Sequence, residues 1–165
     1  MRKRLFIISF TVLMIGIIFI FQLDRLAIVQ ANSNLNVENM KLLKEEKLVL
    51  SELGEGRYLE GMGGYGREYS SLGVLLGFSD DSDSNAFHKV SSIETENENH
   101  SLFGVSVGDE VSKLSDVLKR KAYSKDLYSN LYVKRELHIS YDEESGVIKK
   151  LRIWYIDNKV MGRLY

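Results

Sequence analysis

The feature that most constrains this chain is an uncharged apolar run near its N-terminus. The run extends from Leu5 to Leu23, and a basic segment at residues 2–4 precedes it. As a helix, the run would be about 28 Å long, close to the roughly 30 Å hydrocarbon core of a bilayer. Positive charge before such a run keeps the N-terminus in the cytoplasm. We therefore predict a single-pass transmembrane helix, with residues 1–25 as cytoplasmic tip and anchor and membrane lipid as the partner of residues 5–23.

Cleavage of this segment is the alternative. Val29-Gln30-Ala31 is a tolerable small-x-small cleavage signature, although the charged Asp24-Arg25 separates it from the apolar run. An uncleaved signal-anchor is favoured because the run is longer than a usual signal peptide. The predicted location is the cell membrane, with the C-terminal domain extracellular. Secretion after cleavage near Ala31 remains the other reading.

The exported part has a nearly balanced charge and no cysteine. Residues 24–165 contain 19 basic and 23 acidic side chains, and the whole chain has neither cysteine nor proline. Disulfides and cysteine-based metal sites are excluded. The mildly acidic balance argues against nucleic acid as a partner. In the sequence, no polybasic patch for anionic lipid is evident.

The exported part divides into a short linker, residues 26–36, and a domain, residues 37–165. Apolar residues near a 3.6-residue spacing predict a helix that ends at Gly54. A Gly/Tyr-rich connection, an alternating strand around residues 72–78 and a second strand at Val90–Thr95 follow. We predict an α+β fold in which helices pack on one face of an antiparallel sheet.

The second half of the domain repeats this plan. A helix is expected from Glu110 to about Arg120, and alternating strands are expected at 137–141 and Val147–Tyr155. A turn at residues 142–146 joins the strands. The two similar helix–hairpin units would span residues 37–100 and 101–165.

The second unit resembles a known kind of envelope module. Phe103-Gly-Val-Ser-Val-Gly-Asp-Glu-Val begins it, and a hairpin with Y-x-x-x-x-L-x-I-x-Y-D and G-V-I-x-x-L-x-I closes it. This pattern resembles the small modules of the BamE/SmpA and β-lactamase-inhibitor-protein type, and uncharacterised exported proteins of Gram-positive bacteria. The resemblance implies helices on one face of an antiparallel sheet and binding of another protein. The chain lacks the proline after the helix and the lipid-carrying cysteine of those families.

Two loops carry residue types that bind ligands. The run from Gly61 to Gly66 satisfies G-x-G-x-x-G, but a strand rather than a helix follows it, so no nucleotide cofactor is predicted. Asp81, Asp83 and Asn85 begin like a calcium loop without its later glycine and glutamate. They are weak calcium candidates, and no cofactor or firm metal site is predicted.

Aromatic residues supply the interface candidates. Tyr65 lies in the Gly/Tyr-rich run, where tyrosine offers contact area at low entropic cost. Arg152 and Trp154 have the opposite parity to Leu151 on the last strand, and exposed Trp beside Arg is typical of interfaces.

No catalytic residue is predicted. The expected function is a membrane-anchored, extracytoplasmic, non-enzymatic protein-binding or scaffolding module of the bacterial cell envelope, with an envelope protein as partner. The alternative is a small ligand-binding protein or hydrolase that uses the acidic and Gly-rich loops.

Overall fold

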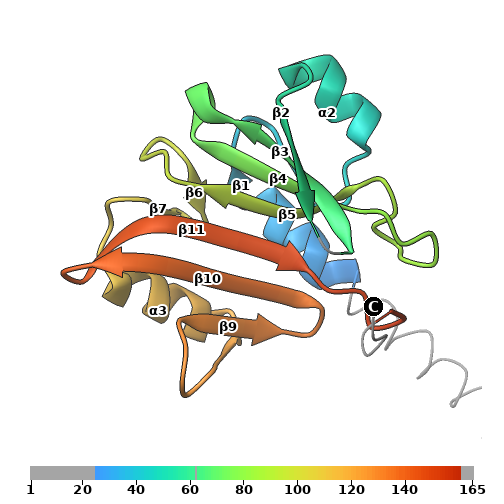
Figure 1. The fold of residues 1–165 in the computed structure, drawn as a ribbon. Coiled ribbons are helices and arrows are strands. Elements are labelled where there is room, and N and C mark those ends of the chain that lie inside the picture. Colours follow the sequence, from blue (N-terminus) through green and yellow to red (C-terminus); the bar gives the residue numbers. More distant parts are fainter. Residues whose placement is uncertain (1–24, 62, 161–165) are drawn as a thin grey trace, which may run out of the picture.

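A large antiparallel sheet dominates the computed structural model, which describes residues 25–61 and 63–160. Its eight strands have the order β2-β3-β4-β5-β11-β10-β9-β8 (Figure 1). The strands are β2 (Arg57–Gly61), β3 (Gly64–Tyr69), β4 (Val74–Ser79), β5 (Val90–Thr95), β8 (Ser124–Lys125), β9 (Leu131–Lys134), β10 (Leu137–Glu144) and β11 (Val147–Tyr155).

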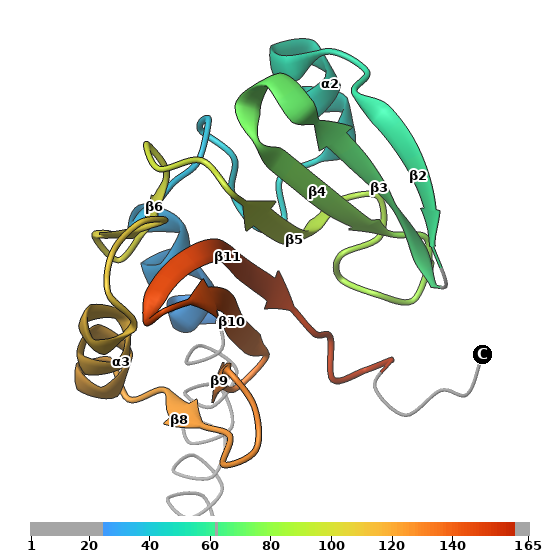
Figure 2. The same ribbon diagram turned by 60° about the vertical axis from the view of Figure 1, so that its left-hand side comes forward.

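Short helices and a small second sheet cover one face of this large sheet. The small sheet contains β1 (Leu35–Asn36), β6 (Ser101–Leu102) and β7 (Val105–Ser106). The helices are α2 (Glu46–Leu53), α3 (Val111–Arg120), the 3-10 turn η1 (Ser70–Leu72) and a helical segment at residues 25–33. Figure 2 shows α3 beside β10 and β11, and α2 near β3, at the other end of the sheet.

Alternation along the strands decides which side chains enter the core. Successive residues of a strand point to opposite faces of its sheet. On β11, Leu151, Ile153 and Tyr155 are buried, while Arg152 and Trp154 between them are only partly buried. On α3, Leu114 and Leu118 lie one turn apart and are fully buried, so the helix packs its apolar side onto the sheet.

The predicted α+β class is wrong, because the described part of the chain is mostly β and its helices are short. The main error concerns the first helix. Asn39 and Leu43 have positive φ angles of 58° and 64°, which end any helix there. Met40 is buried from a turn rather than from a helix, and α2 begins only at Glu46. The Gly/Tyr-rich run, expected to be a connection, forms the paired strands β2 and β3.

The prediction of a transmembrane helix also receives no support. Residues 5–23 lie outside the described residues. Within residues 25–61 and 63–160, no helix has both the length and the apolar character needed to cross a membrane. The single-pass and signal-anchor descriptions are therefore withdrawn.

The structure places residues 26–36, expected to be a linker, inside the folded body. Ala27 and Ala31 face the core, and Ala31 is completely buried. The Asn32 side chain accepts a hydrogen bond from the Leu42 backbone N–H at 2.8 Å and donates one to the Leu42 carbonyl at 3.0 Å. Cleavage near Ala31 would therefore separate a packed helix from its core.

The order of the strands makes the two halves of the large sheet mirror each other. Each half is a helix followed by a four-stranded meander: α2 with β2–β5, and α3 with β8–β11. The halves meet where β5 pairs with β11, with Ile93 opposite Ile153. This arrangement leaves a long, uninterrupted face opposite the helices.

Candidate functional site

The face of the large sheet that points away from the helices is the first candidate site. We call it the open face. It is formed by the outward side chains of the four central strands, namely Leu75 and Gly77 on β4, Ser92 and Glu94 on β5, Lys150, Arg152 and Trp154 on β11, and His138 and Asp142 on β10.

An aromatic pair lies at one end of the open face. Trp154 pairs with His138 across β11 and β10, and their rings stack with centroids 5.5 Å apart and an interplanar angle of 29°. Burial lowers the pKa of His138. The pair thus presents a flat, largely neutral aromatic surface at neutral pH.

A shallow groove runs beside this pair. It has a volume of about 420 Å³, and Trp154, Leu75 and Ser92 are among its lining residues. On the neighbouring strand β4, Gly77 lies directly opposite Ser92. A Cβ added at Gly77 would lie 2.2 Å from the Ser92 Oγ, so this position accepts only glycine without a shift of its neighbour.

A ladder of ion pairs continues from the groove across β5, β11 and β10. Arg152 donates from Nη1 and Nη2 to the two Asp142 oxygens at 2.8 and 2.6 Å, and from Nε to Glu94 at 2.5 Å. Lys150 bridges Glu94 and Glu96, with both Nζ–O distances 2.7 Å. The bond to Asp142 raises the pKa of Arg152, and Arg152 in turn lowers the pKa of Asp142. These side chains are held in place before any ligand arrives.

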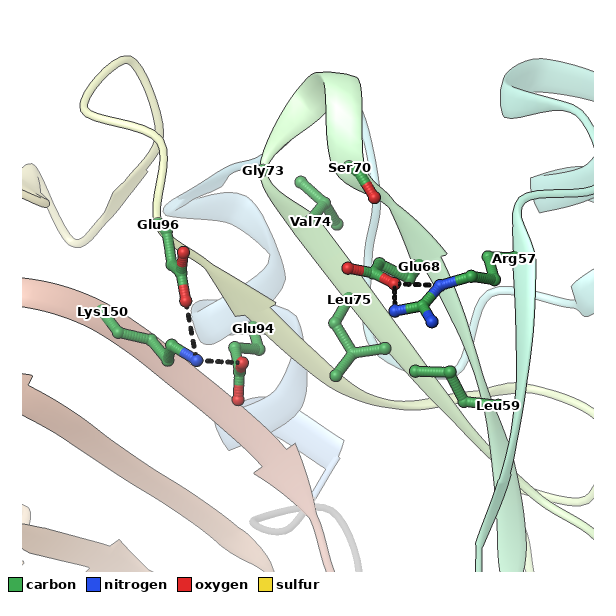
Figure 3. Close-up of a pocket in the computed structure, with 10 residues that line it drawn as sticks. All are labelled: Arg57, Leu59, Glu68, Ser70, Gly73, Val74, Leu75, Glu94, Glu96 and Lys150. Carbon is green, nitrogen blue, oxygen red and sulfur yellow. Dashed lines mark hydrogen bonds and ion pairs between the residues drawn. The ribbon is translucent and has the colours of Figure 1, made fainter.

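The ladder borders a second groove of about 330 Å³ (Figure 3). Lys150 with its two glutamates forms one wall, and the ion pair between Arg57 and Glu68 lies on the other side. Leu75 lies between these charged groups, and Leu59 lies beside Arg57 on β2. The open face therefore combines fixed charges with small apolar patches, a composition suited to binding a polypeptide surface.

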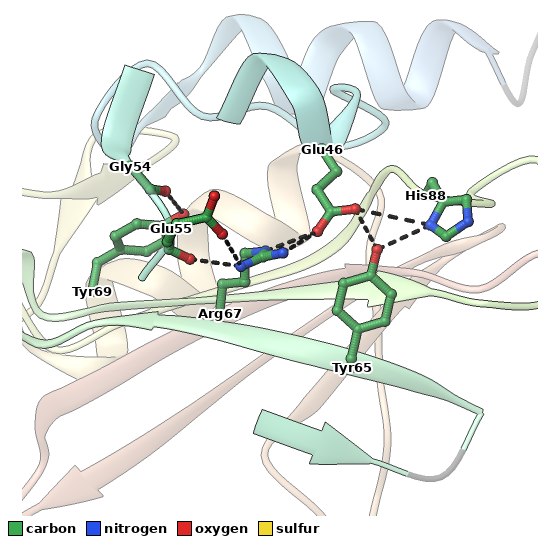
Figure 4. Close-up of polar contacts among 7 residues, drawn as sticks. All are labelled: Glu46, Gly54, Glu55, Tyr65, Arg67, Tyr69 and His88. Atoms are coloured by element: carbon green, nitrogen blue, oxygen red, sulfur yellow. Dashed lines mark hydrogen bonds and ion pairs between the residues drawn. The ribbon is translucent and has the colours of Figure 1, made fainter. Parts of the chain in front are cut away.

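The second candidate site is a polar cluster between α2 and β3 (Figure 4). The Glu46 carboxylate accepts a hydrogen bond from the Tyr65 hydroxyl at 2.5 Å. It also receives two from Arg67, from Nε at 2.8 Å and from Nη2 at 2.7 Å. Arg67 donates further to the Glu55 carbonyl at 2.7 Å. The cluster therefore connects Glu46, at the start of α2, and Glu55, just after its end, to strand β3.

The charges of this cluster restrict its chemistry. Burial, and then the hydrogen bond to Glu46, raise the pKa of Tyr65 well above its usual range, so the phenol keeps its proton. The Glu46 carboxylate is already paired with Arg67 and hydrogen-bonded to Tyr65. His88 Nδ1 lies 3.0 Å from the Tyr65 oxygen and 3.9 Å from Glu46 Oε2. The arrangement functions as a structural tie with one exposed histidine at its rim.

The structure brings two of the three interface candidates together and separates the third. Arg152 and Trp154 are neighbours on the open face of β11, whereas Tyr65 points to the helix side of β3. Sequence reasoning did not name His138 and Glu94 as interface candidates, although both lie on the open face. The alternation of β11 was visible in the sequence. The partners of Arg152 depend on strand register, and the sequence alone does not show the register.

The acidic loop does not converge on a cation. The Asp83 N–H donates to the Asp81 carboxylate at 2.9 Å, a local turn, and the Asn85 N–H donates to Asp157 at 2.6 Å. In the part of the chain that the structure describes, no group of three or more His, Cys, Asp or Glu could hold a metal ion. The glycines of the G-x-G-x-x-G run lie in the β2–β3 hairpin, where Gly61 pairs with Gly64.

Comparisons with known proteins give no family. No family model matches the chain, and no curated protein matches it. Among solved structures, the chain is similar to an extracellular protein containing a SCP domain from Bacillus anthracis str. Ames, with 13% identity and a TM-score of 0.47. The match covers 78% of this chain and 48% of that protein, so the chain spans about half of its neighbour's length. A likeness at this level assigns no function, and the resemblance to BamE/SmpA and β-lactamase-inhibitor-protein modules stays an expectation.

Proposed function

We propose that this chain is a non-enzymatic protein-binding module that captures an envelope protein with its open face. The observation that carries the proposal is the stacked pair of Trp154 and His138 beside preformed ion pairs and two grooves. Aromatic residues and arginine supply most of the binding energy in protein interfaces. Side chains that are already fixed lose little entropy when a partner docks.

An extracytoplasmic location is part of the proposal. Its support is the basic start followed by an uncharged run, a pattern typical of export sequences, and the lack of cysteine. The non-enzymatic character is supported by the second site, where Tyr65 stays protonated and Glu46 is already paired with Arg67. Within residues 25–61 and 63–160, no comparable geometry favours a hydrolase or ligand-binding protein built on the acidic and Gly-rich loops.

In-cell crosslinking tests the open face directly. A photoreactive amino acid placed at His138 should form a discrete adduct with one envelope protein, identified by mass spectrometry. Trp154→Ala should reduce binding of the purified partner at least tenfold, because truncating an interface tryptophan typically removes about 2 kcal/mol or more. Tyr58→Ala is the matched control, since Tyr58 is an exposed aromatic on the opposite side of the sheet.

The proposal fails under two outcomes. One is an adduct of equal yield from a crosslinker at Ser82, in the acidic loop. The other is unchanged partner affinity in the Trp154→Ala protein. A thermal melt of each variant would show whether loss of binding reflects loss of the fold.

A further inference from the structure

One stretch of the chain concentrates positive charge. Residues 119–135 contain six Lys or Arg side chains and a single acidic residue, Asp126. The rest of residues 24–165 contains 13 basic and 22 acidic residues. The nearly balanced total therefore conceals a strongly polarised molecule.

The fold places these cations on one edge of the large sheet, which we call the basic edge. It is made of the last turn of α3, strands β8 and β9, and their connections (Figure 2). The basic residues are Lys119, Arg120, Lys121, Lys125, Lys134 and Arg135. The outermost strand, β8, is paired on one side only, so the basic edge lies at one end of the large sheet.

Aromatic rings and backbone carbonyls position three of these lysines. Lys134 Nζ donates to the Lys121 carbonyl at 2.8 Å and lies 5.4 Å from the centre of the Tyr123 ring. Lys121 lies over Phe103 at 4.7 Å, and Lys125 lies over Tyr132 at 5.8 Å. The cations are thus spread along the edge over aromatic side chains that keep them there.

An apolar tip projects from the same edge. Leu127 is 89% exposed and Tyr128 is 96% exposed, in the loop between β8 and β9. The loop is fixed by two bonds: the Asp126 N–H donates to the Leu131 carbonyl at 2.8 Å, and the Tyr128 N–H donates to the Asp126 carboxylate at 2.7 Å. Both apolar side chains are therefore held out towards solvent by a defined turn.

We infer that the basic edge docks on the surface of an anionic lipid bilayer, with Leu127 and Tyr128 entering the headgroup region. Clustered Lys and Arg are attracted to acidic lipids, and tyrosine favours the membrane–water interface. A soluble polyanion would also attract the lysines, but it would offer nothing to Leu127. The combination of cations with an exposed leucine therefore selects a bilayer over a dissolved polymer. This contact lies on the surface of the bilayer, and it is independent of the partner proposed for the open face.

A fluorescent probe at the tip tests this inference in the full chain. Since the chain contains no cysteine, Ser129→Cys can be labelled with an environment-sensitive dye at one place only. Ser82→Cys, in the acidic loop, is the matched control. The dye reports the polarity of its own surroundings, and the probe at residue 82 reports any contact made by another part of the domain.

The expected result is a blue shift and a several-fold brightening at residue 129 with vesicles of phosphatidylglycerol and phosphatidylcholine. Pure phosphatidylcholine vesicles should give little change, and the probe at residue 82 should not respond. Combined Lys119→Gln, Arg120→Gln and Lys125→Gln should abolish the response. Leu127→Ser should reduce it at least threefold while leaving the melting temperature unchanged.

Three results would overturn the inference. They are no response at residue 129 with anionic vesicles, an equal response with neutral vesicles, and an equal response with soluble polyphosphate in the absence of lipid. The last result would assign the basic edge to a dissolved polyanion.

Discussion

The two halves of the chain share a backbone plan but differ in the side chains that occupy it. Before β5, the Glu46 N–H donates to the His88 carbonyl at 3.0 Å. Before β11, the Val111 N–H donates to the Gly146 carbonyl, also at 3.0 Å. His88 has a φ of 50° and Gly146 a φ of 77°, so both adopt the left-handed conformation. The first half thus keeps a histidine where the second half has the residue that suits this backbone best.

A second pair of positions repeats the pattern. The Leu43 N–H donates to the Val90 carbonyl, and the Gly108 N–H donates to the Ile148 carbonyl, both at 2.8 Å. Leu43 and Gly108 have φ angles of 64° and 92°. Side chains in this region carry strain of about 1–2 kcal/mol. The comparison teaches that, beside its polar cluster, the first half keeps side-chain-bearing residues at two positions where the second half has glycine, and that α3 packs with two buried leucines where α2 packs with Val49.

The largest expected effect tests the apolar packing of α3 against that of α2. Leu114→Ala should lower the free energy of unfolding by about 3 kcal/mol, because it opens a cavity under α3. Val49→Ala, the buried residue of α2, should have less than half that effect, because a smaller side chain is removed. Urea unfolding with an unchanged m-value measures both. Equal losses would contradict the view that α3 depends more on apolar packing than α2 does.

The next effect concerns the polar side of the comparison. Glu46→Gln should destabilise the protein by about 2 kcal/mol, because Arg67 is only 13% exposed and would keep only the more distant, exposed Glu55 carboxylate as a countercharge. Glu110→Gln is the control in the second half, since Glu110 is exposed at the start of α3 and should change stability by less than about 0.5 kcal/mol. If the two variants melted alike, the cluster would contribute nothing to the attachment of α2.

Substitutions at the two left-handed positions, His88 and Gly146, test the contribution of backbone strain. His88→Gly should relieve strain and stabilise the protein by up to about 1 kcal/mol, less the lost contact with Tyr65. Gly146→Ala should destabilise it by about 1 kcal/mol. Thermal unfolding shows whether each variant is more or less stable than the parent protein. A His88→Gly protein that is clearly less stable would mean that the histidine contacts outweigh the backbone strain.

The smallest effect is a pH dependence that belongs to the second half. The pKa of His138 is lowered by burial in the folded protein, so the unfolded chain binds the proton more readily. Stability is therefore fully present above the unfolded pKa, near 6.5, and falls as the pH drops below it. His138→Gln should flatten the stability profile below about pH 6.5. An unchanged slope would place the acid sensitivity elsewhere.

Local patterns were sufficient to predict individual strands but not their assembly. The strand Val147–Tyr155 is confirmed residue for residue, because its apolar residues alternate from Leu151 to Tyr155; Ile148 breaks the alternation and is buried beside the register shift at Asp142/Glu143. The segment before α2 misled because buried Met40 mimics a helical period, while the turns at Asn39 and Leu43 lack the glycine that would reveal them.

The candidate sites depend on contacts between distant parts of the chain. Glu94 meets Arg152 only because β5 pairs with β11 in one register. Tyr65 meets Glu46 and His88 only because β3 lies beneath α2. The basic stretch at residues 119–135 is visible in the sequence. It was overlooked because the charge was counted over the whole exported part, residues 24–165.

The pairing of β5 with β11 has a consequence for how the molecule assembles. Every other pairing in the large sheet joins strands of the same half, whereas this one closes the largest loop. Contacts between distant segments form slowly, so we expect each meander to fold early and the seam between them to close last. While the seam is open, each half exposes an unpaired strand that fits the other half of any copy of the chain. At high concentration during refolding, two chains would therefore be able to exchange halves and form a swapped dimer.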